Sequence, residues 1–319
     1  MSKRITYIDT AKGILILLML VGHIWNDGFV HDFIYVFHMP AFFILSGMTS
    51  SRKEISARGV GKFLLSRSRT LLVPYLCFEL YALGVDLICS GVYLNAKGYA
   101  YQILTLRLFN GPLWFLTVMF LSGILFYFLQ GVKSQKVQYA VMLVLLAVVM
   151  VMPQFQAYVS PATVILALLF TMIGASARTV FEQVSARGGR LPLLMGITVL
   201  LSFAELGEMA SYQSGSRVLF LLGSLVGTAM ILGLSRRFDH KFLAFCGRNS
   251  LIILGSHYPI IRLTQHFLSF EEFSLIGGIV FFAALVPVEV LIIKFVNRFL
   301  PFAAGKPCFR KRNTQEVAR

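Results

Sequence analysis

The sequence predicts an all-α, polytopic integral membrane protein with about ten transmembrane helices and both termini in the cytoplasm. Composition is the first reason. Of the 319 residues, 57% are hydrophobic and 13% are charged, and the mean hydropathy is +0.76, outside the range of soluble domains. The second reason is that apolar segments long enough to cross a bilayer recur along the chain. The third is that the connections between them alternate between rich and poor in basic residues.

Ten apolar segments are expected to form the spans. They lie at residues 6–26, 33–50, 70–91, 112–130, 138–153, 161–178, 191–209, 216–235, 249–268 and 275–298. Those at 33–50 and 138–153 are short for a span, so their ends are the least defined. We therefore expect one transmembrane domain over residues 1–319, with a basic cytoplasmic tail from about residue 299.

Basic residues decide the predicted orientation. With the N-terminus in the cytoplasm, 25 of the 29 lysines and arginines fall on the inner side and four on the outer side. The positive-inside rule predicts this asymmetry, and the opposite orientation would violate it at every connection. The net charge of +15 is therefore a topology signal, and we expect no nucleic-acid partner.

The cysteines predict neither disulfides nor a metal site. Cys77 and Cys89 lie in a predicted span, while Cys246 and Cys308 face the cytosol, where thiols stay reduced. No cluster of histidine and cysteine has the spacing of metal ligands, so no metal is expected.

Two ionisable side chains, whose placement in a membrane costs free energy, share one face of the first apolar segment. His23 follows Lys12 by eleven residues. That is about three helical turns, so the side chains should align roughly 16 Å apart along the helix axis. Ionisable groups inside a membrane are expensive and usually functional. Lys12 is predicted near the cytoplasm and His23 towards the outside, which indicates chemistry across the membrane.

Several short motifs around these residues carry a family resemblance. They are Asp9-x-x-Lys12-Gly13-Ile14, Gly22-His23, Phe37-His38-Met39-Pro40-Ala41-Phe42-Phe43-Ile44-Leu45-Ser46-Gly47, Arg67-x-Arg69-x-x-x-x-Pro74-Tyr75, Pro112-Leu113-Trp114-Phe115 and Gly247-Arg248-Asn249-Ser250-Leu251, followed by His257. Together they resemble the membrane-bound acyltransferase family 3, most closely its fucose 4-O-acetylase-like branch. The resemblance covers nearly the whole chain, and the first fifty residues are its most specific part.

The resemblance implies a function. Members of that family move acyl groups, usually acetyl from cytoplasmic acetyl-CoA, onto hydroxyls of carbohydrates such as surface polysaccharides or lipid-linked glycans. We therefore expect an O-acyltransferase of the bacterial cytoplasmic (inner) membrane. Acetyl-CoA would be its acyl donor, and a glycan and membrane lipids its other partners.

Two histidines are the candidate catalytic residues. His38 lies near the outer end of the second segment, which runs opposite to the first, so it is expected at the same depth as His23. A general base for an acceptor hydroxyl needs a pKa near the working pH, which suits histidine. His23 is the first choice as base, and Asp27 would orient its ring if the helix continues to that residue. Alternatively, both histidines are hydrogen-bonded packing residues.

Basic residues at the cytoplasmic side are candidates for binding the donor. Arg67 and Arg69 are expected where a helix begins, and Lys12 lies at the same side of the membrane. Arginine commonly holds phosphate, so these cations are candidates for the 3′-phosphate and pyrophosphate of coenzyme A. They also fit other roles, because Lys12 can pair with Asp9 and the arginines are typical of a positive-inside connection.

Three further residues are candidates for binding the acceptor. Trp114 is expected near the outer interface, where it would stack on a sugar or belong to the aromatic belt. Glu79 and Asp86 are seven residues apart on one face of the third segment. They would line an acceptor cavity or satisfy polar groups within the bundle.

Two alternatives to an acyltransferase with a histidine base stay open. A covalent acyl-histidine relay would use the same residues. A transporter or flippase of a glycan or small molecule would also place charged residues in a bundle, although the sequence has no clear internal repeat or paired broken helices.

Overall fold

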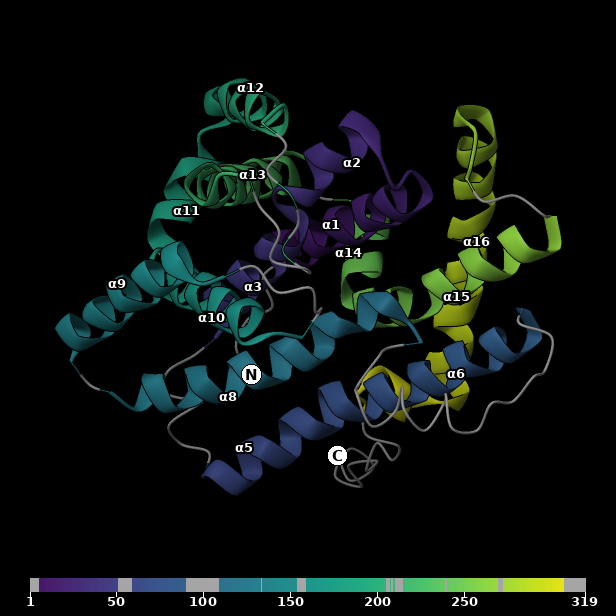
Figure 1. The fold of residues 1–319 in the computed structure, drawn as a ribbon, viewed down its shortest axis with the longest axis horizontal. Helices are drawn as coiled ribbons and strands as arrows, with labels where there is room; N and C mark the ends of the chain where they lie inside the picture. The colour runs from purple at the N-terminus through teal and green to yellow at the C-terminus, as the bar shows by residue number, and fades with distance from the viewer. Residues whose placement is uncertain are drawn as a thin grey trace, which may run out of the picture.

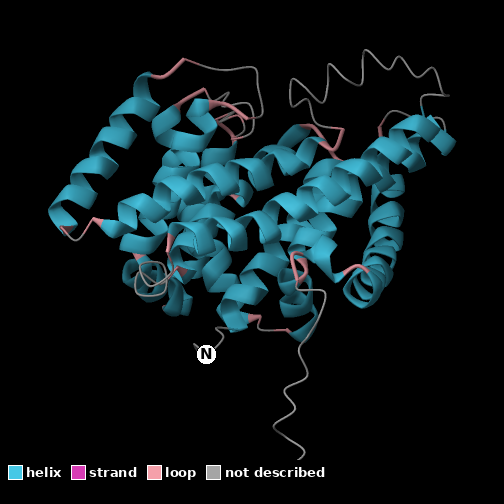
Figure 2. Ribbon diagram, turned by 90° about the horizontal axis from the view of Figure 1, so that it is seen from below, coloured by secondary structure: helices cyan, strands magenta, loops and turns pink. Residues whose placement is uncertain are grey.

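The computed structural model describes residues 6–50, 59–89, 109–132, 134–153, 159–204, 207, 209, 215–238, 240–268 and 272–306. All regular secondary structure in these residues is helical, as the ribbons of Figures 1 and 2 show. Residues 51–58 and the basic residues 307–319, including Cys308, lie outside this part. The all-α prediction is confirmed.

The α-helices are α1 (Thr6–Ile24), α2 (Gly28–Tyr35), α3 (His38–Thr49), α5 (Val60–Arg67), α6 (Val73–Cys89), α8 (Trp114–Gly131), α9 (Gln135–Val151), α10 (Pro161–Ser176), α11 (Arg178–Ala186), α12 (Leu191–Ser202), α13 (Arg217–Arg237), α14 (Lys241–Arg248), α15 (Ser250–Leu268) and α16 (Leu275–Phe299). A π-helical turn, Ser68–Leu72, joins α5 to α6, and short 3₁₀ turns lie at Gly111–Leu113, Gly188–Arg190 and Pro301–Ala304.

Each of the ten predicted segments overlaps a helix, but the count of ten spans is not confirmed. Within the described residues, six helices are long and apolar enough to cross a membrane, or seven if α10 and α11 form one bent span. The bend between α10 and α11 is 69°. The apolar helices at Gln135–Val151 and Gly188–Ser202 are shorter.

Two segments begin earlier than predicted. Apolar residues before residue 33 extend the second span back to Gly28, so that it covers Gly28–Thr49. The third covers Val60–Cys89, so the expectation that Arg67 and Arg69 lie at a helix start is wrong. Both lie inside this long helix: Arg67 is the last residue of α5, and Arg69 lies within the π-turn. Proline has no N–H to donate four residues back, and the π-turn accommodates this loss just before Pro74.

Helix α1 is the centre of the bundle. It contacts α2, α3, α13, α14, α15 and α16, of which α2, α3, α13 and α14 lie close around it in Figure 1. Its closest partner is α14, and two glycines make this possible: a Cβ on Gly13 would overlap the Leu243 carbonyl, and a Cβ on Gly247 would overlap the Asp9 carbonyl. Small residues allow backbones to approach in this way in membrane proteins. The glycines thereby hold the helix that carries Lys12 and His23.

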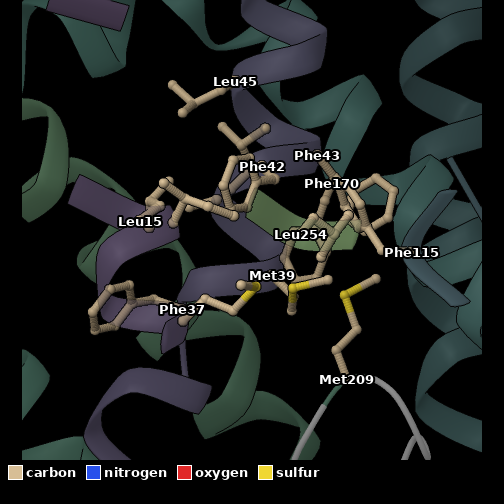
Figure 3. Packing of buried hydrophobic residues seen from close by; sticks show 14 of the residues in the cluster. Leu15, Phe37, Met39, Phe42, Phe43, Leu45, Phe115, Phe170, Met209 and Leu254 are labelled. Atoms are coloured by element: carbon tan, nitrogen blue, oxygen red, sulfur yellow. The ribbon is translucent and has the colours of Figure 1, made fainter. Parts of the chain in front are cut away.

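The same device joins α3 to α10. A Cβ on Gly47 would overlap the Thr171 carbonyl, and a Cβ on Gly174 would overlap the Ile44 carbonyl. Around these contacts the core is apolar and fully enclosed, with Phe43 and Phe170 both 0% exposed (Figure 3). Helix α3, which also contacts α1, is therefore fixed between two neighbours.

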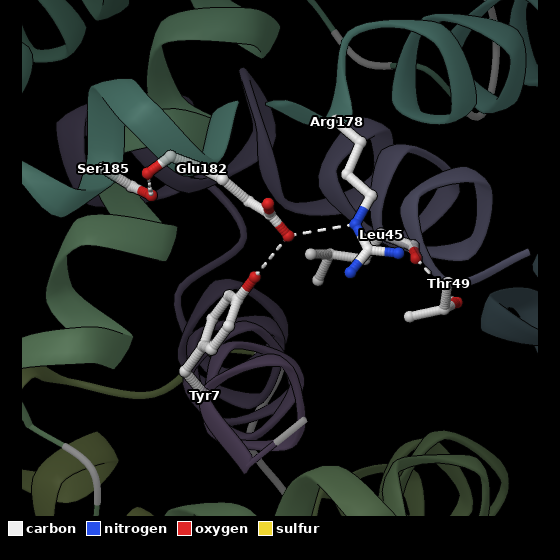
Figure 4. A network of polar contacts seen from close by, with 6 residues as sticks. All are labelled: Tyr7, Leu45, Thr49, Arg178, Glu182 and Ser185. Atoms are coloured by element: carbon white, nitrogen blue, oxygen red, sulfur yellow. Dashed lines mark hydrogen bonds and ion pairs between the residues drawn. The ribbon is translucent and has the colours of Figure 1, made fainter. Parts of the chain in front are cut away.

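A polar network ties α1 to α11 at one end of the bundle (Figure 4). The Glu182 carboxylate accepts a hydrogen bond from Tyr7 Oη at 3.1 Å and one from Arg178 Nε at 2.9 Å. Ser185 Oγ donates to the Glu182 carbonyl at 3.3 Å. Tyr7 lies on α1 near Lys12, so this network anchors the Lys12 end of the central helix.

Candidate functional site

Two cavities adjoin inside the bundle. The first has a volume of about 360 Å³ and includes Lys12 and Arg67 in its wall. The second has a volume of about 280 Å³ and includes His23 and His38. They share the wall residues Met19, Met39 and Leu254, so the two cavities adjoin at these residues.

One face of α1 runs along both cavities. Lys12 and Ile16 line the first cavity, Met19 lines both, and His23 lines the second. These residues are spaced by four, three and four positions, which keeps them on one side of a helix. The predicted alignment of Lys12 with His23 is therefore present, and it connects two cavities.

The first cavity combines cations with hydroxyl groups. Ser46, Thr49, Ser50 and Ser250 line it together with Lys12 and Arg67. The Arg67 guanidinium carbon lies 5.5 Å from the centroid of the Phe63 ring, a cation–π distance. Arg69 is exposed and is not among the residues of this wall. The two arginines predicted to act together are thus separated, and Lys12 and Arg67 are the cations that share a cavity.

The second cavity is lined by aromatic and imidazole rings. His23, His31, Tyr35, His38, Trp114 and Tyr258 all contribute to its wall. The His31 and Tyr35 rings stack at 3.8 Å between centroids, and the Tyr35 and His38 centroids are 4.7 Å apart. Trp114 is only 4% exposed, so it belongs to the cavity and not to an exposed aromatic belt.

The two histidines predicted to be catalytic differ in their hydrogen-bond partners and in their exposure. His38 Nδ1 lies 3.1 Å from the Ile34 carbonyl, which can only accept, so Nδ1 carries the proton and Nε2 keeps a free lone pair. His23 Nδ1 lies 3.4 Å from Tyr35 Oη. His38 is 2% exposed, whereas His23 is half-buried. His23 is therefore the more accessible imidazole in the cavity wall.

A third histidine lies beside them. The His257 and His23 ring centroids are 5.1 Å apart. His257 Nδ1 donates to the Ile253 carbonyl at 2.8 Å, and its buried Nε2 has no hydrogen-bond partner in the described residues. His257 follows one of the sequence motifs, but no chemical role was predicted for it.

Asp27 does not continue the α1 helix. That helix ends at Ile24, and Asp27 is the exposed residue that precedes α2. The condition under which Asp27 would orient His23, a continuous helix over both residues, is not met. Tyr35 is the residue with a polar atom near His23 Nδ1.

The two carboxylates of α6 contact other helices and loops. Glu79 Oε2 accepts hydrogen bonds from the backbone N–H groups of Phe109 at 3.0 Å and Asn110 at 3.4 Å. Asp86 Oδ1 accepts from Arg262 Nη2 of α15 at 2.7 Å. Neither carboxylate is in the wall of the two cavities. Glu79 instead holds the segment that leads into Trp114.

Loss of the Asp86–Arg262 pair is expected to destabilise the bundle. Asp86→Ala should lower the unfolding free energy by about 1–2 kcal/mol, less than for a fully buried pair because the Arg262 side chain is 35% exposed. Thermal unfolding in detergent measures this. The double variant Asp86→Ala/Arg262→Ala should recover part of the loss, whereas strictly additive effects would contradict a direct pair.

Comparison with known proteins decides the family. A family model described as "Acyltransferase domain" (Acyl_transf_3) matches residues 5–294, nearly the whole chain. The chain belongs to this acyltransferase family. The resemblance inferred from the motifs is thereby confirmed at the level of acyltransferase family 3, and so is the expectation of an integral membrane protein, which the apolar helices support.

One curated relative of this family member is the Nodulation protein NolL of Mesorhizobium japonicum. It is similar to this chain, with 34% identity over 136 residues. The match covers 37% of this chain and 34% of NolL, so the chain spans about a third of that relative's length. No solved structure matches the chain.

Several cavity residues of this acyltransferase family member were missed by sequence reasoning. His31 and Tyr35 precede His38 by seven and three residues, a helical spacing that places all three on one side. That spacing is a signal by which they could have been found. Nothing in the sequence marks Met19 and Met39 as cavity residues, because methionine is an ordinary core residue of an apolar helix. They differ from other core methionines in that they line both cavities.

Proposed function

We propose that this protein is a membrane O-acyltransferase that moves an acyl group, acetyl from acetyl-CoA, onto a hydroxyl of a carbohydrate. The observation that carries the proposal is the pair of adjoining cavities in a member of an acyltransferase family. One cavity has cations in its wall, and the other has imidazoles. Acyl transfer needs such an arrangement, because an anionic donor must meet a hydroxyl beside a base.

The first cavity suits the donor. Lys12 and Arg67 would hold the 3′-phosphate or pyrophosphate of coenzyme A, since charge-assisted hydrogen bonds to phosphate are strong. With the N-terminus in the cytoplasm, as the basic residues predict, this cavity faces the compartment where acetyl-CoA is made. Arg69, exposed and away from the wall, is expected to contribute less.

The second cavity suits a sugar. Tyr35, Trp114 and Tyr258 are in its wall, and aromatic rings are surfaces on which a pyranose can stack. His23 takes the proton from the acceptor hydroxyl as the oxygen attacks the thioester carbon. The ester C–O bond forms and the C–S bond breaks, and the departing thiolate receives the proton from His23. His38 Nε2 would accept a hydrogen bond from the acceptor and position it.

Turnover tests the proposal against transport. Purified protein in detergent is incubated with radiolabelled acetyl-CoA and a panel of candidate glycans. We expect label in a glycan and release of CoA in equal amounts. Reconstituted vesicles that move a glycan without releasing CoA would instead make the protein a transporter.

Replacement of Arg67 tests the donor cavity. Arg67→Gln is expected to raise the KM for acetyl-CoA about 10- to 100-fold, the range for a lost hydrogen bond to a charged group. Initial rates over a range of acetyl-CoA concentrations measure this. The control is Arg69→Gln, an exposed arginine two residues away, which should change KM little. Equal effects of the two substitutions would place the donor elsewhere.

A further inference from the structure

Three residues from three helices lie where the two cavities adjoin. They are Met19 of α1, Met39 of α3 and Leu254 of α15, and each lines both cavities. We call these three residues the septum. Met39 and Leu254 are among the buried side chains drawn in Figure 3.

The septum lies at one level of the bundle. Along α1, Ile16 lines only the first cavity and His23 only the second, with Met19 between them. A residue three positions before Met19 and one four positions after it thus face different cavities. The division occurs within about one helical turn on either side of Met19.

The other two helices repeat this order. On α3, Phe42 lines the first cavity, Met39 both, and His38 the second. On α15, Leu254 lines both cavities and Tyr258 only the second. On all three helices the lining changes from one cavity to the other at or next to the septum residue, so the septum is the level at which the two cavities adjoin.

The chemistry of the septum fits an acyl group. Its side chains are apolar and nearly enclosed, with exposures of 1% for Met19, 7% for Met39 and 5% for Leu254. None of them is β-branched, and methionine turns about three side-chain bonds, so the septum can open without movement of the helices. A charged or strongly hydrated group would lose its hydrogen bonds there, whereas a short hydrocarbon would not.

We propose that the septum selects the acyl group by size. The acyl part of the donor lies between Met19, Met39 and Leu254, and the width of the space between these side chains limits transfer to short acyl chains such as acetyl. This inference rests on the proposed function. The reacting carbon and oxygen must approach to about 3–3.5 Å, and the septum is where a donor in one cavity and an acceptor in the other meet. There the acyl carbon exchanges its bond to sulfur for one to the acceptor oxygen, and the hydroxyl proton passes to His23 and then to the thiolate.

Truncation of the septum should change which acyl group is transferred. Rates are measured with acetyl-, butyryl- and hexanoyl-CoA, using the glycan labelled in the turnover assay. We expect Met19→Ala and Met39→Ala to raise the butyryl-to-acetyl ratio of kcat/KM at least about tenfold, since one or two methylenes in an apolar site change rates by that order. Leu254→Phe, which narrows the space between the septum side chains, should lower the butyryl-to-acetyl ratio of kcat/KM.

Matched controls separate size selection from general loosening. Met119→Ala changes a methionine that lines only the first cavity, and Met230→Ala changes a buried core methionine of α13 outside both walls. Both should keep the wild-type ratio whatever their total rates. A second readout needs no acceptor, because thermal stabilisation of the protein by each acyl-CoA reports its Kd. Met19→Ala and Met39→Ala should lower the Kd for hexanoyl-CoA relative to the Kd for acetyl-CoA.

The outcomes are distinct. A wild-type protein that transfers acetyl, with ratios unchanged in all three septum variants, would overturn size selection and leave the proposed function intact. Ratios that shift equally in Met230→Ala would overturn it as well. A wild-type protein that transfers no acyl group from any of the three donors would overturn both proposals.

Discussion

Replacement of His23 by alanine is expected to reduce kcat for acyl transfer by about a hundredfold to ten-thousandfold, the usual contribution of a positioned general base. His23 is a half-buried imidazole in the wall of the second cavity, 3.4 Å from Tyr35 Oη and beside His257. Its removal takes away the imidazole to which the proposal assigns the hydroxyl proton. The loss should therefore appear in kcat, with little change in the KM for acetyl-CoA, because Lys12 lies about three turns away along α1 and Arg67 lines the other cavity.

The matched control for this substitution is His266→Ala. His266 is exposed near the end of α15, so its removal should leave turnover at the wild-type level. Both variants are compared at equal amounts of folded, membrane-inserted protein. Retained turnover in His23→Ala together with its loss in His38→Ala would assign the base to His38 instead.

The same variants separate direct transfer from an acyl-histidine intermediate. Wild-type protein incubated with acetyl-CoA alone should release no stoichiometric burst of CoA if His23 acts only as a base. A burst of one CoA per protein that disappears in His23→Ala would instead indicate a covalent relay.

Replacement of Gly13 by alanine is expected to be the most destabilising single methyl addition in α1. The new Cβ would overlap the Leu243 carbonyl of α14, and backbone cannot move aside as a flexible side chain can. Overpacking costs about 1–3 kcal/mol and occasionally more, and a rigid backbone neighbour puts this change at the upper end of that range. The expected result is a large fall in the thermal unfolding temperature in detergent, with loss of both cavities' geometry because α1 carries residues of each.

Gly84→Ala is the control for the glycine prediction. Gly84 lies in α6, and a Cβ there would meet nothing within 4 Å, so alanine should be neutral or stabilise by about 0.5–1 kcal/mol through helix propensity. Equal unfolding temperatures for the Gly13 and Gly84 variants would contradict the close packing of α1 on α14. The reciprocal variant Gly247→Ala should behave like Gly13→Ala, because its Cβ would overlap the Asp9 carbonyl.

The fold class and the family could be predicted from the sequence alone, and so could the alignment of Lys12 with His23 on one helix. Apolar length and charge asymmetry are local properties, and helical periodicity relates residues of one segment, so the alignment of Lys12 with His23 follows from their spacing alone. His38 could be matched to His23 by depth alone. The same reasoning failed where a helix boundary mattered: α1 ends before Asp27, and α5 begins well before Arg67.

Which residues from different helices share a cavity depends on how the whole bundle packs. This packing brought His257 beside His23, separated Arg69 from Arg67, and directed Asp86 to Arg262. Helix-to-helix distances depend on where backbones can approach, as at Gly13 and at Gly47, and on how large side chains fill the remaining space. That is a property of all the packed surfaces together, so no single segment contains it, and the septum between the cavities exists only where α1, α3 and α15 meet.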